Sequence, residues 1–308
     1  MSQTFRIAVA RSFGAPEVIE IEKHPLTELP SGVVRVAVRA AGQNPVDARR
    51  RAGTFGGRPP LVFGTEFSGV VYQSNDPRWN AGDEVVGWGA SGAVADLVVT
   101  DGAKLAAKPE GMDWLVAGGL SGAGYTALTA LDAMKFPEGA LILVHGAAGG
   151  VGSALVQLAV ARGYRVIGTA GTANQDYLRE LGALPVVYGP GLIDRVAQAS
   201  DGKSLDGSID LAGSIEAGDL AQQIRQSGGQ AITLVPETWQ SHGLPLVSVK
   251  HDPSYFGEMA KAYQAGTFRL EVNPLPFTEI VQAHKNMDAK HSRGKLVLDL
   301  ADNPYLAA

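Results

Sequence analysis

The sequence predicts an α/β protein in which a doubly wound parallel sheet is combined with a discontinuous β domain. Apolar residues form 45% of the 308 residues and charged residues 19%, which provides ample material for buried cores. Short strand-like segments fill the first hundred residues, whereas strand-like and helix-like segments alternate from about residue 140. A strand-rich start and a short tail flank the alternating block, so we expect both ends of the chain to form one domain.

The first part of the chain is predicted to be a small, curved β domain. Residues 34–40 alternate apolar side chains with Arg35 and Arg39, which is typical of a half-buried strand. Further strands are expected at 67–72, 84–88 and 95–100, separated by Gly, Asn, Asp and Pro. The composition then changes, and residues 113–134 are predicted to form a helix despite several glycines.

The alternating block predicts a parallel sheet with helices on both faces. We expect its limits at residues 117 and 250, with residues 1–116 and 251–308 forming the second, discontinuous domain. The tail should contain helices near 254–265 and 278–287 and a last strand at 295–300. In the block itself, the expected strands are 141–145, 165–169, 186–188, 209–212, 231–235 and 246–249, and the expected helices are 150–161, 174–181, 192–199 and 217–226.

A glycine-rich loop follows the first strand of the block. Residues 141–144 are continuously apolar and lead into Gly146-Ala-Ala-Gly-Gly-Val-Gly152 and then an apolar helix. The dinucleotide fingerprint falls on Ala147, Gly149 and Gly152, so its first glycine is alanine here. Strand, loop and helix in this order predict a Rossmann domain that binds a dinucleotide pyrophosphate at the helix N-terminus. We expect the pyrophosphate to be bound by Ala148, Gly149, Gly150 and Val151.

The end of the second strand indicates which dinucleotide is bound. Enzymes that use NAD commonly place an acid there to hold the ribose 2′-hydroxyl. This chain has Thr169-Ala-Gly-Thr-Ala-Asn174, and no acid occurs before Asp176. Hydroxyl, amide and backbone N–H groups can bind a 2′-phosphate, which a carboxylate would repel. The cofactor is therefore predicted to be NADPH, bound by Thr169, Gly171, Thr172 and Asn174.

Composition also excludes several classes of function. The chain has no cysteine, and its six histidines show no metal-binding spacing, so no metal site is expected. A net charge of −5 and a pI of about 5.7 argue against a nucleic-acid partner. The sequence shows no long apolar run and no apolar signal core, which predicts a cytoplasmic protein without a membrane partner.

Several segments occur in an order that resembles a known family. They are Asn44-Pro-Val-Asp47, Gly64-Thr-Glu-Phe-Ser-Gly-Val-Val71, Gly82-Asp-Glu-Val-Val86, Gly124-Tyr-Thr-Ala-Leu128, the glycine-rich loop and Arg293-Gly-Lys-Leu-Val-Leu298. Over nearly its whole length the chain resembles the zinc-independent quinone oxidoreductase branch of the medium-chain dehydrogenase/reductase superfamily. The resemblance implies a GroES-like β domain joined to the Rossmann domain. In the zinc-dependent relatives a Cys ligand lies beside Asn44 and a His ligand follows Gly64, where this chain has Asn44 and Thr65.

The resemblance also implies an activity. NADPH would deliver hydride to a quinone or an α,β-unsaturated carbonyl compound, with Asn44, Thr65 and Thr126 as catalytic residues and Tyr188 near the 2′-phosphate. It further implies a homodimer formed through the cofactor domains. Two alternatives stay open: an enoyl-thioester reductase on the same fold, and an NADPH-binding redox sensor without turnover.

Individual residues keep alternative roles at this point. Asn44 could be a turn residue before Pro45, and the hydroxyl of Thr126 could bond to its own helix backbone. Tyr125 could be a proton donor or a core residue. Asp47 and Glu66 are interpreted as structural anchors, His145 as a packed residue, and Arg293 and Lys295 either as cofactor contacts or as part of a solvated turn.

Overall fold

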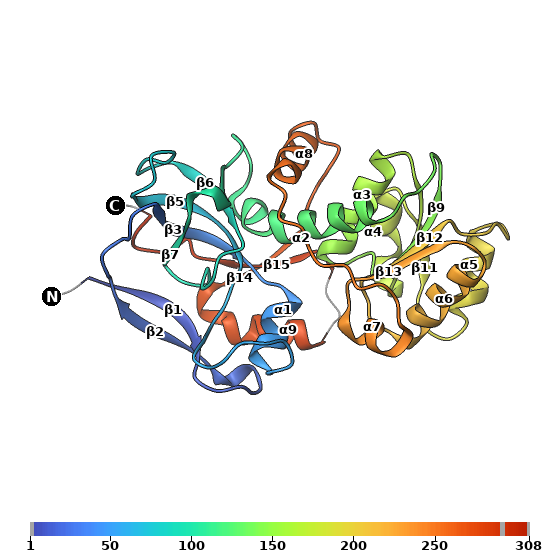
Figure 1. Cartoon of the computed structure of the whole chain (residues 1–308), viewed down its shortest axis with the longest axis horizontal. Helices are drawn as coiled ribbons and strands as arrows, with labels where there is room; N and C mark the ends of the chain where they lie inside the picture. The colour runs from blue at the N-terminus through green and yellow to red at the C-terminus, as the bar shows by residue number, and fades with distance from the viewer. Residues whose placement is uncertain (1–2, 290–292, 307–308) are drawn as a thin grey trace. The chain divides into compact units, whose positions relative to one another are not determined.

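The computed structural model describes residues 3–289 and 293–306 and divides the chain into two compact units (Figure 1). Unit 1 combines residues 1–122 with residues 271–308, and unit 2 contains residues 123–270. Both ends of the chain thus belong to one unit, as the sequence predicts. The units change at 122/123 and 270/271, whereas the predicted domains change at 116/117 and 250/251.

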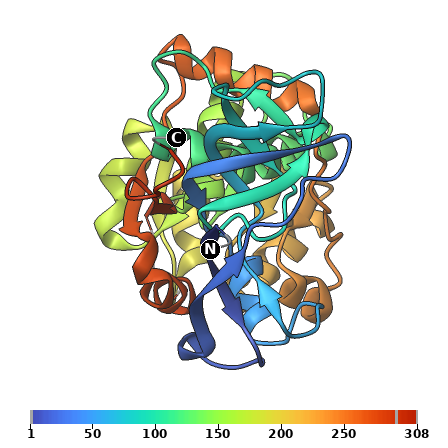
Figure 2. The same cartoon turned by 90° about the vertical axis from the view of Figure 1, so that its left-hand side faces the viewer.

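Unit 1 is built from two antiparallel-rich sheets. One has the strand order β14-β15-β3-β5-β6-β8, with β7 paired to β3, and the other has the order β2-β1-β4. Figure 2 shows the β1–β2 hairpin of the smaller sheet in dark blue. The strands are β1 Thr4–Ala10, β2 Ile19–Pro25, β3 Val33–Gly42, β4 Leu61–Val62, β5 Glu66–Ser74, β6 Glu84–Trp88, β7 Leu97–Asp101, β8 Leu105–Ala107, β14 Val272–Pro276 and β15 Lys295–Asp299.

Apolar side chains from both sheets form the core of unit 1. Val34, Val36 and Val38 of β3 are fully buried in this core. Arg35 and Ala37, which lie between them, are also buried, so β3 is covered on both faces rather than half-buried as the alternation predicts. Two helices cover the sheets, α1 Pro45–Arg51 and α9 Ile280–Ala289, together with the short 3₁₀ turns η1 Pro16–Val18, η2 Gly102–Lys104 and η4 Phe277–Glu279.

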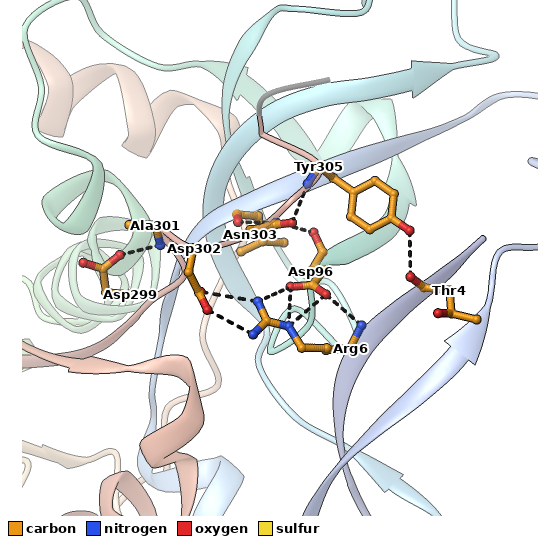
Figure 3. A network of polar contacts seen from close by, with 9 residues as sticks. Thr4, Arg6, Asp96, Asp299, Ala301, Asp302, Asn303 and Tyr305 are labelled. Atoms are coloured by element: carbon orange, nitrogen blue, oxygen red, sulfur yellow. Dashed lines mark hydrogen bonds and ion pairs between the residues drawn. The ribbon is translucent and has the colours of Figure 1, made fainter.

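The last segment of unit 1 is fixed by a polar network with the start of the chain (Figure 3). The Arg6 guanidinium lies between the carboxylates of Asp96, at 2.9 Å, and Asp302, at 3.0 Å. The Asn303 amide donates to the carbonyl groups of Val38 and Asp96, and Tyr305 Oη donates to the Thr4 carbonyl. These contacts hold β15 in the sheet, where it pairs antiparallel with β3.

Unit 2 contains the predicted doubly wound sheet. Its five strands are all parallel and lie in the order β11-β10-β9-β12-β13. They are β9 Leu141–His145, β10 Arg165–Ala170, β11 Leu184–Val187, β12 Gly207–Asp210 and β13 Gln230–Thr233. The order reverses at β9, which is where open α/β sheets of this kind bind ligands at the carboxyl ends of their strands.

Helices cover both faces of this sheet, with α3 and α4 on one face and α5 and α6 on the other (Figure 1). Apolar residues of α5 and α6 pack on Leu141, Leu143 and Ile167 of the central strands. The helices are α3 Gly150–Ala161, α4 Gln175–Glu180, α5 Leu192–Ala199, α6 Ile215–Gln226, α7 Pro236–His242 and α8 Pro253–Gln264, with the 3₁₀ turn η3 Thr172–Asn174. The boundary between the units falls within α2 Trp114–Ala133.

Two expectations about unit 2 need correction. The predicted strand at 246–249 is a single parallel bridge between Leu246 and Thr233, because the chain makes two backbone hydrogen bonds beside Leu246 and then leaves the sheet. Helix α8 belongs to unit 2 rather than to the tail domain. A Cβ atom at Gly124 would lie 1.5 Å from the Met259 sulfur, so this glycine makes room for α8 on α2.

Candidate functional site

The phosphate loop, residues 146–152, connects β9 to α3 as predicted. Gly146 turns the chain with a φ of +73°, a conformation that favours glycine. Gly149 is the N-cap of α3, so the first N–H groups of the helix face out of the loop. The loop therefore presents unpaired donors and the positive end of a helix dipole, which together suit an anion.

The glycines of this loop serve different purposes. At Gly152 a Cβ atom would lie 2.2 Å from the Gly146 carbonyl oxygen, so only glycine allows the loop to close on its helix. At Gly149 a Cβ atom would meet only that oxygen, at 3.6 Å, and φ is an ordinary −72°. Nothing in unit 2 thus requires glycine at 149, and the open space fits the close approach of a pyrophosphate. Ala148 is buried and Gly150 and Val151 are half-buried at the start of α3.

The end of β10 lies beside the loop. Thr169 is buried, and its hydroxyl accepts a long hydrogen bond of 3.4 Å from the Gly146 N–H, while its carbonyl accepts from Ala147 at 3.0 Å. Thr169 therefore supports the loop. Gly171 is half-buried, and a Cβ atom there would lie 3.5 Å from the Tyr188 hydroxyl. Thr172 is exposed and Asn174 is half-buried.

The turn that carries Tyr188 also holds a cation, which the sequence reading missed. Tyr188 is 48% exposed and follows β11. The Arg195 guanidinium donates to the carbonyl groups of Val187 at 2.9 Å, Gly189 at 2.8 Å and Pro190 at 2.8 Å. A positive charge thus lies in the Tyr188 turn, together with the Glu216 carboxylate, which accepts from the Gly189 N–H at 3.1 Å. Arg195 lies seven residues after Tyr188, within α5. In the amphipathic pattern of that helix it looks like an ordinary solvent-exposed arginine, so the sequence does not indicate its contact with the Tyr188 turn.

His145 ends β9 directly before the loop and is 1% exposed. Burial lowers the pKa of His145 to about 4, against a smaller opposing effect of the Asp210 charge, so the ring is neutral at physiological pH. Asp210 ends the neighbouring strand and accepts from the N–H groups of Ala212 and Gly213 and from the Thr233 hydroxyl. We interpret both residues as part of the support beneath the loop.

Unit 1 contains a second, separate arrangement, the Asn44 cluster, made of Asn44, Glu66, Ser121, Gly122 and Lys295. The Lys295 ammonium contacts Glu66 Oε1 at 2.7 Å and donates to Asn44 Oδ1 at 2.6 Å and to the Gln43 carbonyl at 2.8 Å. Asn44 Nδ2 donates to Glu66 Oε1 at 2.9 Å. The other oxygen of Glu66 accepts from the Gly122 N–H at 2.6 Å and from the Ser121 hydroxyl at 3.1 Å.

Four distant segments supply this cluster. Asn44 is the N-cap of α1, Glu66 begins β5, and Lys295 begins β15. Ser121 and Gly122 lie on α2, where a Cβ atom at Gly122 would lie 2.3 Å from Glu66 Oε1. The side chains of Lys295 and Glu66 are only 5% and 2% exposed, so their attraction acts in a medium less polar than water.

The cluster fixes the orientation of the Asn44 amide. The Asn44 oxygen accepts from the Lys295 ammonium, and the Asn44 nitrogen donates to the Glu66 carboxylate. The reversed orientation would place the amide N–H donors against the ammonium and the amide oxygen against the carboxylate. The nitrogen carries two hydrogens, of which Glu66 takes one. Because Asn44 is only half-buried, the second hydrogen is available to an oxygen atom outside the cluster.

Asp47 is an anchor rather than part of this chemistry. Its carboxylate accepts from the Asn44 N–H at 3.1 Å and from the Gly64 N–H at 3.2 Å, which ties α1 to the segment before β5. Complete burial raises the pKa of Asp47, although both hydrogen bonds oppose that shift. Thr65, directly after Gly64, is half-buried, and its carbonyl accepts from Ala90.

The remaining predicted residue, Thr126, lies half-buried on the part of α2 that belongs to unit 2. Its neighbour Tyr125 is buried, and burial raises the pKa of its hydroxyl. The Tyr125 ring packs edge-on against Tyr255 and His251, with centroids 6.0 and 5.9 Å away. The structure thus brings Asn44 together with Glu66 and Lys295. Lys295 is no solvated turn residue, and no local pattern indicated its partner.

The described residues were also compared with the requirements of a metal site and of a membrane-spanning helix. Within residues 3–289 and 293–306, no cluster of three or more His, Cys, Asp or Glu side chains is placed to hold a metal ion. Nor does any helix in those ranges have the length and apolar character needed to span a membrane.

Comparison with known proteins agrees with this architecture. Residues 30–133 match the model of the alcohol dehydrogenase GroES-like domain, and residues 150–235 match that of the zinc-binding dehydrogenase domain. The quinone oxidoreductase of Rattus norvegicus is 29% identical over 314 residues, which cover 92% of this chain and 93% of that protein. The chain belongs to the quinone oxidoreductase branch of the medium-chain dehydrogenase/reductase superfamily. The predicted family and fold class are thereby confirmed.

Two other members of the superfamily are similar over most of their length. The solved quinone oxidoreductase structure from Coxiella burnetii has a TM-score of 0.85 and 26% identity, and it covers 97% of this chain and 100% of its own. The NADPH-dependent alkenal/one oxidoreductase of Arabidopsis thaliana chloroplasts is 29% identical over 311 residues, which cover 94% of this chain and 78% of that protein. As an oxidoreductase of this branch, the chain is expected to use a nicotinamide cofactor.

Proposed function

We propose that this protein is a zinc-independent, NADPH-dependent oxidoreductase that reduces a quinone or an α,β-unsaturated carbonyl compound. The observation that carries the proposal is the Asn44 amide, held by Lys295 and Glu66 with one N–H hydrogen to spare. A fixed donor of this kind can stabilise the negative charge that develops on a carbonyl oxygen during reduction. The amide stands at the position where the zinc-dependent relatives supply a metal ligand.

The residues of unit 2 fit the cofactor. When bound, NADPH supplies the hydride for the reduction. Ala148, Gly149, Gly150 and Val151 would hold its pyrophosphate, since the helix N-terminus offers N–H groups and Gly149 leaves space. The ribose 2′-phosphate would be bound by Gly171, Thr172, Asn174 and Tyr188, while Thr169 supports the loop from below.

Charge favours NADPH over NADH in this arrangement. The end of β10 offers hydroxyl, amide and N–H groups without a carboxylate. In the Tyr188 turn the Arg195 guanidinium and the Glu216 carboxylate are both bound to the backbone, so this turn adds charges of both signs. Each hydrogen bond to a charged phosphate contributes roughly 1.5–3 kcal/mol, so a preference of at least about tenfold in kcat/KM is expected. The name of the Arabidopsis relative, an NADPH-dependent enzyme, supports the same choice.

The test is oxidation of NADPH and NADH against a panel of quinones, enones and enoyl thioesters, with a chelator present throughout. We expect quinone or enone reduction that survives chelation, and replacement of Asn44 or Thr126 with Ala should lower kcat/KM by roughly 10- to 1000-fold. A Gly171→Asp variant should lose the preference for NADPH. Reduction of enoyl thioesters alone would favour the alternative acceptor class, and tight NADPH binding with no acceptor reduced would indicate a redox sensor.

We also propose a homodimer formed through unit 2. Leu246, which bridges β13 at the edge of the parallel sheet, is 39% exposed, and Val249, three residues further on, is 38% exposed. An apolar sheet edge is usually covered. Light scattering should give about twice the chain mass of 32.1 kDa at micromolar concentration. A Leu246→Asp variant should shift that mass toward the monomer.

A further inference from the structure

Unit 1 contains a pocket that the chemistry described above does not use. Its volume is about 570 Å³, and it is an open depression rather than an enclosed cavity. The lining comes from α1, from the segment that follows it, from β4 and from the loop after β6, and consists of Arg50, Phe55, Gly56, Gly57, Arg58, Pro60, Leu61, Val62 and Ser91. All of these residues belong to unit 1.

The charge of this pocket is one-sided. Two guanidinium groups, from Arg50 and Arg58, line it, and no carboxylate does. The stretch between Asp47 and Glu66 contains four arginines and no acid. Both flanking acids are engaged elsewhere, because Asp47 accepts from backbone N–H groups and Glu66 is bound within the Asn44 cluster. The pocket is therefore positive although the whole chain carries a net charge of −5.

The two pocket arginines differ from the arginine beside them. Arg51 is buried and is paired with Asp288 at 2.8 Å, and it also donates to the Gly14 carbonyl. Within the part of the chain that the structure describes, no ion pair or side-chain hydrogen bond is found for Arg50 or Arg58. Two like charges around one pocket repel each other, and the buried Asp47 carboxylate, which interacts with Arg50, offsets part of that repulsion. An anion from outside the chain would offset the rest.

An aromatic ring accompanies the two charges. Phe55 is 45% exposed at the pocket, where Gly56 and Gly57 turn the chain with φ values of +58° and +89°. An exposed phenylalanine beside two guanidinium groups suits a ligand that has a flat, conjugated body and an acidic group. Arg50 also lies six residues after Asn44 along α1, which corresponds to about 9 Å along the helix axis and about 120° around it.

We propose that this pocket selects acceptors that carry an anionic group, a carboxylate or a phosphate, and that Arg50 and Arg58 are the specificity-determining residues. The inference rests on the proposed function, since it concerns the acceptor of that reaction. The acceptor's carbonyl group would be reduced near Asn44, and the anion at the other end of the conjugated body would be bound by the guanidinium groups.

The experiment uses the full chain with NADPH and three matched enones: benzylideneacetone, its para-carboxylate and its para-phosphate. The first is neutral, and the other two carry the anion at the end opposite to the carbonyl group. We expect kcat/KM for at least one anionic enone to exceed that of the neutral one by about tenfold, and salt at 0.5 M to remove most of the difference. The better of the two anions identifies the group that the pocket binds.

Three sets of variants test whether the preference for anionic enones depends on the positive charge of Arg50 and Arg58 and on the location of these residues at the pocket. Arg50→Gln with Arg58→Gln should raise KM for the anionic enone about 5- to 20-fold and leave the neutral enone within about twofold. Replacement of both arginines with lysine should retain a substantial part of the preference. Arg165→Gln is the matched control, because it removes one exposed arginine at the start of β10 in unit 2. Equal kcat/KM values for charged and neutral enones in the unaltered protein would overturn the proposal.

A binding measurement distinguishes this proposal from the proposed function. Calorimetric titration with 4-(3-oxobutyl)benzoate, which has no alkene to reduce, reports binding of the anion without turnover. Binding that depends on Arg50 and Arg58 in a protein that reduces no acceptor would refute the proposed function and support the anion pocket. Reduction of neutral enones without arginine-dependent binding of the benzoate would refute the pocket and support the function.

Discussion

The two candidate sites of this molecule are constructed in opposite ways. The phosphate loop of unit 2 is made from residues that follow one another, and it keeps open space at Gly149. The Asn44 cluster of unit 1 joins residues up to 251 positions apart, and every donor of its buried ammonium is engaged. The loop thus has open space for a ligand, whereas the polar groups of the cluster bind one another and leave a single amide hydrogen. Substitutions of the charged residues of the cluster should therefore affect stability. Substitutions in the loop should affect stability where glycine is sterically required, at Gly152, and binding where the space is open, at Gly149.

The largest effect is expected from removing the ammonium of the cluster. Lys295→Met leaves the Glu66 carboxylate buried without its counterion, which should lower the free energy of unfolding by about 3–5 kcal/mol. Urea denaturation followed by circular dichroism measures the loss. The double variant Lys295→Met with Glu66→Gln removes both charges and should recover at least half of it. If the single variant were as stable as the unaltered protein, the buried pair would have no structural importance.

A smaller loss is expected in the loop where glycine is sterically required. Gly152→Ala places a Cβ atom 2.2 Å from a backbone oxygen that cannot move independently of the loop, which should cost roughly 2–3 kcal/mol of stability. NADPH affinity should fall with it, as fluorescence titration would show. An alanine variant with unchanged stability and affinity would contradict the close packing of loop and helix described here.

Acid should destabilise both units, and one buried histidine allows the effect in unit 1 to be isolated. Burial, helped by the charge of Arg51, lowers the pKa of His284 to about 3, and neither ring nitrogen has a partner among the described residues. The unfolded chain takes up a proton below pH 6.5 and the folded chain does not, so stability falls by about 1.4 kcal/mol per pH unit as the pH drops from 6.5 toward 3.

His284→Leu removes this titration and should therefore lose about 2 kcal/mol less stability than the unaltered protein between pH 7.5 and pH 5. Urea denaturation at the two pH values gives the comparison. His145→Leu, at a site where the pKa is lowered to about 4, is the matched change in unit 2. Parallel pH profiles for His284→Leu and the unaltered protein would show that His284 has the same pKa in the folded and the unfolded chain.

The smallest effect on stability is expected at Gly149, the partner of Gly152 in this comparison. Because a Cβ atom there meets nothing closer than 3.6 Å, Gly149→Ala should change stability by less than about 0.5 kcal/mol. It should nevertheless weaken NADPH binding about tenfold or more, since the added methyl group occupies the space for the pyrophosphate. Unchanged affinity would mean that the ligand does not approach the loop at this residue.

The same contrast explains how much of the molecule could be predicted from its sequence. The loop, its strand and its helix are consecutive, so apolar runs and glycine spacing indicate them together, and Gly152 has the packing role expected of it. Asn44 was singled out by resemblance. The residues around Lys295 in the sequence do not indicate that it pairs with Asn44 and Glu66, because the pairing depends on β15 lying beside β3.

Two elements illustrate the limits of pattern in more detail. Residues 246–249 are apolar enough for a strand, but an isolated bridge forms instead, since strand formation depends on a partner that continues alongside. β14 contains Pro274 and Pro276, which argue against a strand, yet it pairs in parallel with β15 at the edge of the sheet, where missing N–H donors are tolerated.

The position of β15 in the sheet also has a consequence for how the chain matures on the ribosome. Its partner residues on β3, Ala40 to Gly42, emerge early, whereas Val297, the partner of Gly42, follows 255 positions later. At synthesis rates of about 5–20 residues per second, this edge of β3 waits roughly 13–50 s for its neighbour. During that interval the nascent polypeptide exposes an apolar strand edge, and a chaperone that shields such edges would find its substrate there.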